Sequence, residues 1–366
     1  MNELARKIVI GLEVETYSIN VSSYSIGRSL SRPRPGLSED GEQFSRDTSI
    51  GSEYKSRPYA TVREAFFLLK TGLRKYLRRL YRAQKNFKNH NVPLLVGGWM
   101  DRAAGAHMHI SVAGREMTPA MARSLAWHIH DHIPLLIALG ANSPIWDRKM
   151  TAVASNRVLR GSRTYFRPIR RGRLSRKDNE EMVFNRGRKT KPPTLELRIF
   201  DSNLPEFLVA SLCVVKAIAL RWLKDQPSTN RVLYADYLRA RVGAALRGTR
   251  CRIPWGGEWL SLGKYLDRFV REYREELEQM DVPDEIFDVL RLAKRGYNGA
   301  RIVREACHNS IRVHPQTWQK RFAKRYESGL GTLLSGNLLA TFAKELKVRL
   351  PNTGNVWLGR RGGAFN

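Results

Sequence analysis

Hydrophobic and polar residues alternate in three stretches of the chain, at residues 7–18, 107–112 and 194–200. Because successive side chains of a strand point to opposite faces, each stretch predicts a strand with an apolar back and a polar front. Residues 92–98 predict a further strand. Residues 19–60 are rich in Ser, Gly, Arg and Pro, and they predict a long ordered loop or short strands joined by turns.

Apolar residues spaced three or four positions apart predict several helices. From Thr61 onward a stripe of apolar residues alternates with Arg and Lys, which is typical of a basic amphipathic helix. Residues 119–139 and 205–223 predict two largely buried helices, and the second begins at a proline. After Leu262 the helical pattern continues almost to Leu346.

The order of these elements predicts an α+β fold in three parts. Residues 1–206 hold the strands, residues 207–350 are mostly helical, and residues 351–366 form a loose, Gly-rich tail. Between residues 148 and 191 there are 15 Lys or Arg against three Asp or Glu, and we expect a flexible basic insertion there.

The composition is that of a globular protein, with 42% hydrophobic and 27% charged residues. The 64 Lys and Arg exceed the 34 Asp and Glu, and the resulting net charge of +30 favours a nucleic acid or another polyanion as partner or substrate. The alternative is a basic surface that is merely solvated, or that suits a host with unusual salt or temperature.

The three cysteines are widely spaced and form no CxxC pair, which argues against a disulfide framework and a zinc site. The N-terminal apolar run is too short for a signal peptide, and no stretch reaches the roughly 18 apolar residues of a membrane span. We therefore expect a soluble, cytoplasmic protein without a membrane partner, encoded by a cell or by a virus.

Each of the three alternating strands carries two chemically competent residues, two positions apart, on its polar front. These pairs are Glu13 and Glu15, His107 and His109, and Glu196 and Arg198. If one sheet brings the fronts together, carboxylates and imidazoles suit a divalent cation bound to phosphate, and the arginine can stabilise a transferring phosphoryl group. Each pair alone is typical of an ordinary strand or of structural histidines, but three pairs favour a magnesium-nucleotide site.

Two other segments contain candidate ligands. Residues 46–58 place Glu53 in a Gly/Ser-rich stretch, where it is either a further metal ligand or part of a solvated loop. His128, His130 and His132 lie on a predicted helix, where side chains two positions apart diverge, so we expect structural roles for them. The chain has no GxxxxGK[ST] phosphate loop, so ATP would have to be held by metal ions and a sheet.

The order of four motifs resembles the glutamine-synthetase-like carboxylate-amine ligase superfamily, in particular its glutamate-cysteine ligase type 2 and phage or bacterial amidoligase branches. The motifs are GLEVE, GAHMHIS, LGANSPIWDRKMTAVASNR and TLELRIFDSN. The resemblance spans residues 8–206 and implies that residues 1–206 form a catalytic domain, with an antiparallel glutamine-synthetase-like active-site sheet surrounded by helices.

Carried over residue by residue, the resemblance implies a set of magnesium ligands and a set of phosphate contacts. The implied metal ligands are Glu13, Glu15, Glu53, His107 and Glu196. His109 and Arg198 are implied to contact the phosphates of ATP, and Arg157 to serve the substrate or a phosphate. Glu196, Arg198 and Arg157 are the implied catalytic residues.

We therefore expect an ATP- and Mg²⁺-dependent ligase that joins a carboxylate to an amine through an acyl phosphate, with a polyanion or nucleic acid as a candidate carrier of the substrate. Two alternatives stay open. One is a related phosphotransferase that stops at the phosphorylated product, and the other is a nucleic-acid-binding protein on a ligase-like scaffold. The sequence identifies neither the acid nor the amine.

Overall fold

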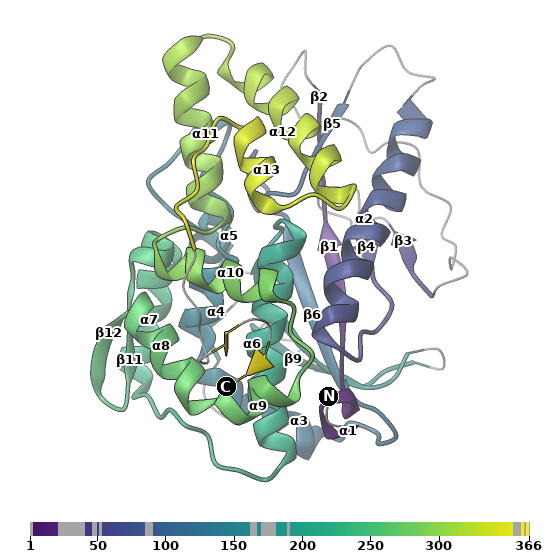
Figure 1. Cartoon of the computed structure of the whole chain (residues 1–366), viewed down its shortest axis with the longest axis vertical. Coiled ribbons are helices and arrows are strands. Elements are labelled where there is room, and N and C mark those ends of the chain that lie inside the picture. Colours follow the sequence, from purple (N-terminus) through teal and green to yellow (C-terminus); the bar gives the residue numbers. More distant parts are fainter. Residues whose placement is uncertain are drawn as a thin grey trace.

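The computed structural model describes residues 3–20, 41–45, 50, 53–84, 91–161, 167–169, 181–188, 191–353, 360–361 and 364–365. At its centre lies a six-stranded antiparallel sheet with the strand order β3-β4-β1-β6-β10-β9 (Figure 1). Its strands are β1 (Ile8–Glu15), β3 (Gln43–Ser45), β4 (Glu53–Lys55), β6 (Gly105–Val112), β9 (Met182–Asn185) and β10 (Thr194–Asp201). The three alternating stretches form the neighbouring strands β1, β6 and β10, and the predicted α+β fold is confirmed.

Helices cover the apolar back of this sheet. They are α2 (Val62–Gln84), α3 (Pro119–His130), α4 (Ile133–Gly140) and α6 (Pro205–Leu223). α6 packs on β1, α3 and α4 pack on β10, and α2 packs on β4 and α6. The buried strand residues beneath them are Ile8, Ile10, Leu12, Val14, Met108, Ile110, Leu195 and Leu197. Burial of each such side chain contributes about 1.5–3 kcal/mol, so this face anchors the sheet.

α6 begins and ends where its sequence pattern predicts, and nearly all its residues are buried. An ion pair ties it to α2, because Lys70 Nζ lies 2.6 Å from Glu206 Oε1 and both side chains are buried. Burial raises the pKa of Glu206, although the charge of Lys70 opposes that rise. The pair therefore depends on both partners remaining in place.

The prediction of a single helix over residues 119–139 is wrong. The chain forms two helices, α3 and α4, which are interrupted at Asp131 and His132. Pro134 explains the break, since it has no N–H to donate to the carbonyl of His130 and its ring crowds that carbonyl. The strand predicted at residues 92–98 is also shorter, because β5 (Asn91–Leu94) ends at Leu94 and pairs with β2 (Tyr17–Asn20).

The described parts of the basic stretch 148–191 contain regular structure. β8 (Lys149–Met150) pairs with β7 (Ile145–Trp146), and α5 (Asn156–Gly161) follows. β9 forms an edge of the central sheet, so it is a structural part of that sheet. The arginines at positions 170, 171 and 173 lie outside the described residues.

The remaining elements surround this core. They are α1 (Glu3–Lys7), α7 (Tyr234–Arg247), η1 (Gly248–Arg250), β11 (Arg252–Trp255), β12 (Glu258–Ser261), α8 (Leu262–Glu272), α9 (Arg274–Gln279), α10 (Asp284–Lys294), α11 (Gly299–Val313), α12 (Trp318–Leu334), α13 (Leu339–Glu345), β13 (Arg360–Arg361) and β14 (Ala364–Phe365). Figure 1 shows α11, α12 and α13 gathered at one end of the molecule. The hydroxyl of Tyr326 on α12 donates to the carbonyl of Leu95 at 2.9 Å, which joins these helices to the sheet region.

The three cysteines are buried and unpaired. Within the described ranges, every helix is too short or too polar to cross a membrane.

Candidate active site

The strand register places the three predicted pairs side by side on the front of the sheet. Glu13 on β1 lies opposite His107 on β6, and Glu196 on β10 lies opposite His109 on β6. These side chains are partly exposed, whereas the residues between them are buried in the core. Arg198 shares this front face, because it lies two positions beyond Glu196.

The imidazole of His107 lies between two carboxylates. Its Nδ1 atom is 3.7 Å from Glu13 Oε2 and 3.4 Å from Glu196 Oε1. His109 Nε2 is 3.6 Å from the same Glu13 oxygen, and Arg198 Nε is 3.5 Å from Glu196 Oε1. Carboxylate oxygens from two strands thus face one ring nitrogen, and this set of donors suits a divalent cation.

Neighbouring side chains orient the outer atoms of this group. The amide of Asn185 donates to Glu196 Oε2 at 2.6 Å, and Thr194 Oγ1 lies 3.2 Å from His109 Nδ1. Such contacts fix the direction in which a carboxylate or an imidazole presents its free atom.

Charge and burial act against each other in this cluster. Burial raises the pKa of Glu13, but the neighbouring imidazoles of His107 and His109 outweigh it and hold that pKa well below its usual range. Burial lowers the pKa of His107, yet Glu13 and Glu196 raise it above the ordinary value. Burial also raises the pKa of Glu196, and the charges of the two histidines bring it below its usual value. The carboxylates are therefore ionised at neutral pH.

β4 extends the front face on the other side of β1. Lys55 lies opposite Glu13 in the ladder, and Glu53 lies opposite Glu15. The ammonium nitrogen of Lys55 is 2.8 Å from Glu13 Oε1 and 2.9 Å from Glu53 Oε2. Glu53 therefore reaches the predicted site, and a lysine connects it to Glu13.

Glu15 lies at the end of β1, two positions beyond Glu13 on the same front face. Its carboxylate accepts a hydrogen bond from the backbone N–H of Gly105. Its backbone carbonyl accepts from the hydroxyl of Ser202 at 2.6 Å. The charge of Glu15 favours the protonated forms of both His107 and the buried Arg157, so Glu15 belongs to the same group of charges.

Arg157 enters the site from α5. Its Nη1 donates to the carbonyl of Arg198 at 2.9 Å, and its Nη2 lies 3.4 Å from His107 Nε2. Only 2% of the residue is exposed, and burial lowers its pKa to about 10. Gly105 permits this approach, because a Cβ atom at that position would lie 2.1 Å from Arg157 Nη2.

Asp201 organises the residues that lead into α5 and hold Arg157 in place. Its Oδ2 accepts from the backbone N–H of Asn142 at 2.7 Å and from the hydroxyl of Ser143 at 2.8 Å, and its Oδ1 accepts from Ser155 at 2.9 Å. Ser143 Oγ in turn accepts from the backbone N–H of Arg157 at 3.1 Å. Burial raises the pKa of Asp201 to about 6.

A bulge in β10 brings Asp201 to the front face. Leu197 pairs with Met108, but the next pair is Phe200 with Ala106, so β10 has one residue more than β6 over this interval. Strict alternation from Leu197 would place Asp201 on the apolar back. The extra residue moves it to the front, opposite Gly105.

The three histidines near residue 130 contact other parts of the protein. His130 Nδ1 lies 2.8 Å from Asp131 Oδ1. His132 is enclosed by aromatic rings, and its ring nitrogens lie 2.9 Å and 3.1 Å from the hydroxyls of Tyr265 and Tyr273. Burial lowers the pKa of His132 to about 3, so this ring is neutral at physiological pH.

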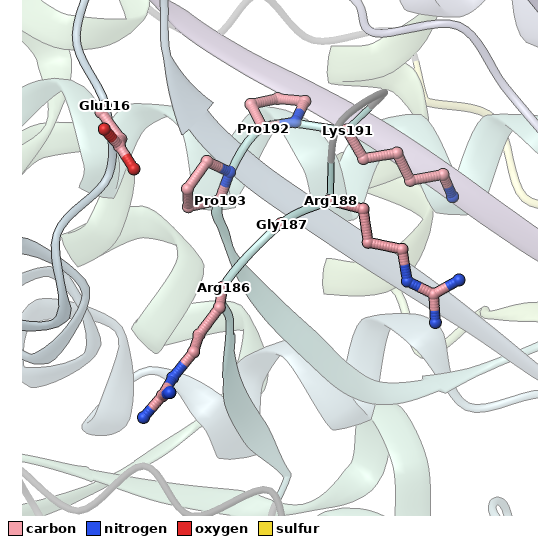
Figure 2. Close-up of a pocket in the computed structure, with 7 residues that line it drawn as sticks. All are labelled: Glu116, Arg186, Gly187, Arg188, Lys191, Pro192 and Pro193. Carbon is pink, nitrogen blue, oxygen red and sulfur yellow. The ribbon is translucent and has the colours of Figure 1, made fainter.

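An open pocket of about 460 Å³ lies beside the segment that joins β9 to β10. Its lining residues are Glu116, Arg186, Gly187, Arg188, Lys191, Pro192 and Pro193. Figure 2 shows Arg188 and Lys191 extending to the same side, with Arg186 pointing away from them. Lys191 Nζ lies 3.8 Å from Glu13 Oε1, so one lining residue of the basic pocket reaches the front of the sheet.

Part of the chain has a sequence similar to a known family. Residues 75–164 match the model of glutamate-cysteine ligase family 2. A putative glutamate-cysteine ligase 2-3 from Rubrobacter xylanophilus is 41% identical over 64 residues, and that segment covers 17% of this chain and 16% of the relative.

Solved structures resemble almost the whole chain. The ligase PafA in complex with the prokaryotic ubiquitin-like protein Pup superposes with a TM-score of 0.62 and 11% identity, over 94% of this chain and 80% of that chain. The chain has the fold of the carboxylate-amine ligases. Glutamate-cysteine ligase from Francisella tularensis in complex with AMP shares this ligase fold, with a TM-score of 0.57 and 12% identity, over 93% of this chain and 92% of that chain. The predicted glutamate-cysteine-ligase-like fold is confirmed.

Some atoms of this ligase fold lack the partners that a ligand would supply. Among the residues that the structure describes, no group of three or more His, Cys, Asp or Glu side chains is arranged to hold a metal ion as it stands. Two buried nitrogens on the front face, His109 Nε2 and Arg198 Nε, have no hydrogen-bond partner in the same part of the chain. Buried donors of this kind are ordinarily satisfied, so the observation favours a ligand with acceptor oxygens.

Lys55, Gly105 and Asp201 are the site residues that sequence reasoning missed. Lys55 follows Glu53 by two positions, which is the same spacing that identified the other pairs. The sequence therefore showed that Glu53 and Lys55 share a face of one strand. It did not show that Glu13 lies opposite Lys55, because that depends on how the strands pair.

Proposed function

We propose that this protein is an ATP- and Mg²⁺-dependent ligase that joins a carboxylate to an amine through an acyl phosphate. The observation that carries the proposal is the group formed by Glu13, His107 and Glu196, with Arg198 and Arg157 beside it, on the front of a carboxylate-amine ligase fold. Carboxylates, imidazole and guanidinium groups at one place match the needs of phosphoryl transfer.

The donors present fit magnesium and a nucleotide. Glu13, His107 and Glu196 would hold the metal, which would neutralise phosphate charge during transfer. Donor atoms that bind one magnesium ion at about 2.1 Å lie about 3 Å from each other. The observed separations of 3.4 and 3.7 Å are near that spacing, which supports the fit. His109 Nε2 and Arg198 Nε are available to donate to phosphate oxygens.

The reaction needs no nucleophile from the protein. An oxygen of the substrate carboxylate attacks the γ-phosphorus of ATP, the bond to the β,γ-bridging oxygen breaks, and ADP leaves. The amine then attacks the acyl carbon, phosphate leaves, and the amine loses a proton. Arg198 and Arg157 would stabilise the charge that develops on the phosphoryl oxygens. Asp201, Ser143 and Gly105 hold Arg157 in position.

The basic pocket supports an anionic carrier for the acid or the amine. Arg186, Arg188 and Lys191 line it, and the whole chain carries a net charge of +30. A nucleic acid or another polyanion bound there would present its reactive group to the adjacent carboxylates. Such binding would weaken steeply as salt concentration rises.

The test is turnover by the purified protein with Mg-ATP and panels of acids, amines and polyanions, followed by mass spectrometry of the products. With an ¹⁸O-labelled acid, the proposal predicts an amide, ADP, and one labelled oxygen in the released phosphate. Glu13→Gln should lower turnover by about 100- to 1,000-fold. Ser111→Ala, on the same face of β6 but beyond His109, is the matched control and should stay active.

Two outcomes contradict the proposal. A stable phosphorylated acid that never proceeds to an amide, whatever amine is added, would make the protein a phosphotransferase. Absence of turnover together with absence of Mg-ATP binding would leave a binding protein on a ligase scaffold.

A further inference from the structure

We propose that the ammonium group of Lys55 holds the place of one divalent cation in this site. Lys55 bridges Glu13 and Glu53, so the front face binds one metal ion fewer than its carboxylates would otherwise hold. The inference rests on the magnesium site of the proposed function and specifies how many ions that site takes.

Glu13 is shared between two groups of atoms. Its Oε2 faces the rings of His107 and His109, at 3.7 Å and 3.6 Å. Its Oε1 faces Lys55 Nζ at 2.8 Å, and that ammonium is 2.9 Å from Glu53 Oε2. A carboxylate that bridges two cations uses its oxygens in the same way, one toward each cation.

The backbone directs Lys55 to this position. In the antiparallel ladder Lys55 lies opposite Glu13, and Glu53 precedes it by two residues on the same face of β4. The hydroxyl of Ser45 on β3 donates to the same Glu53 Oε2 at 2.6 Å. The second group therefore consists of two carboxylate oxygens around one ammonium, with a hydroxyl bonded to one of those oxygens. Carboxylate oxygens are among the ligands that magnesium prefers.

The low exposure of this group makes a cation there necessary. The side chains of Lys55, Glu13 and Glu53 are 23%, 15% and 9% exposed. Two carboxylates this close repel one another strongly where water is scarce, unless a positive charge lies between them. Lys55 supplies that charge permanently, whereas a metal ion would have to be recruited from solution.

Lys191 provides a built-in comparison. It approaches the same Glu13 Oε1, but at 3.8 Å and from a side chain that is 50% exposed. That distance and exposure describe a loose surface ion pair. Lys191→Met therefore removes the same charge near Glu13 without opening a place between two carboxylates.

The experiment counts Mn²⁺ bound to the full-length protein, by electron paramagnetic resonance of the free ion, with and without a non-hydrolysable ATP analogue. Lys55→Met should bind one more Mn²⁺ per chain than the wild type, and Lys191→Met should bind the wild-type number. Lys55→Gln, which retains a polar head group, repeats the test if the methionine variant does not fold. Circular dichroism confirms that each variant is folded.

Three results would overturn the inference. An unchanged number of ions in both Lys55 variants, alongside a wild type that binds Mn²⁺, removes the inference and leaves the proposed ligase intact. A similar gain in Lys191→Met would show that general loss of positive charge is the cause. Absence of Mn²⁺ from every protein, even with the nucleotide analogue, would remove both the inference and the magnesium site of the proposed function.

Discussion

The two faces of β1, β6 and β10 are built by alternate residues of the same strands, yet they differ in almost every property. The back consists of Ile, Leu, Val and Met side chains that are buried beneath α3, α4 and α6. The front carries Glu13, His107 and Glu196, which remain partly exposed and face one another. Stability is thus concentrated on one side of each strand and the candidate chemistry on the other. Residues that are neighbours in sequence should therefore respond to mutation in different ways.

The largest effects are expected when Leu12 and Glu13, which lie on opposite faces of β1, are mutated one at a time. Leu12→Ala removes a fully buried side chain from the back and should lower the free energy of unfolding by about 3 kcal/mol. Turnover per folded molecule should be unchanged. Glu13→Gln should have the reverse pattern, because it removes a site carboxylate without opening a cavity in the core, so turnover should be lost while the protein stays folded. Urea unfolding and ATPase assays on both variants make the comparison, and a loss of both properties in both variants would contradict it.

A smaller effect is expected from a mutation of Gly105, which tests how far activity depends on the position of Arg157. Gly105→Ala places a Cβ atom 2.1 Å from Arg157 Nη2 and must displace the guanidinium. A displacement of about 1 Å should lower kcat by about 100-fold. Gly11→Ala is the matched control, because a Cβ atom there meets nothing within 4 Å although Gly11 lies opposite His109 on the same face. Equal activity of the two variants would mean that the position of Arg157 does not matter.

The smallest effect concerns two histidines with opposite environments. Carboxylates raise the pKa of His107 on the front, whereas burial among aromatic rings lowers the pKa of His132 to about 3. The unfolded chain binds a proton at His132 below about pH 6.5, and the folded protein does not until about pH 3. Stability due to this ring is therefore present above pH 6.5 and is lost as the pH falls, by about 2 kcal/mol between pH 7 and pH 5.

This prediction is checked with His132→Gln, whose neutral side chain cannot take up the proton. Urea midpoints at pH 7 and pH 5 should differ less in the variant than in the wild type. The same pH dependence in both proteins would assign the acid sensitivity to other groups.

Much of this site was predictable because the alternation of hydrophobic and polar residues shows which side chains of one strand share a face. The pattern of Leu12, Glu13 and Val14 identifies which side chains share a face, and it did so correctly for β1, β6 and β10. Alternation says nothing about which residues of different strands lie opposite each other. The contact of Lys55 with Glu13 depends on that register, and for this reason Lys55 was missed.

The helix predicted over residues 119–139 shows a different limit. Apolar residues lie on both sides of His130, Asp131 and His132, and residues 133–139 are apolar throughout, so the apolar pattern alone reads as one continuing helix. Pro134 carries the information about the break through its missing N–H and its ring. The environment of His132 also depends on tertiary structure, since Tyr265 and Tyr273 are more than 130 positions away in the chain.

The bulge in β10 affects how residues can be exchanged between proteins of this fold. Before it, even-numbered positions such as Glu196 and Arg198 face the site, whereas after it the odd-numbered Asp201 does. Counting along the strand from Glu196 in a relative without the bulge would therefore assign the wrong residue to the role of Asp201. A grafted or designed version of β10 with the same number of residues must also keep the bulge between Leu197 and Phe200, because strict alternation over that length would turn Asp201 toward the apolar side.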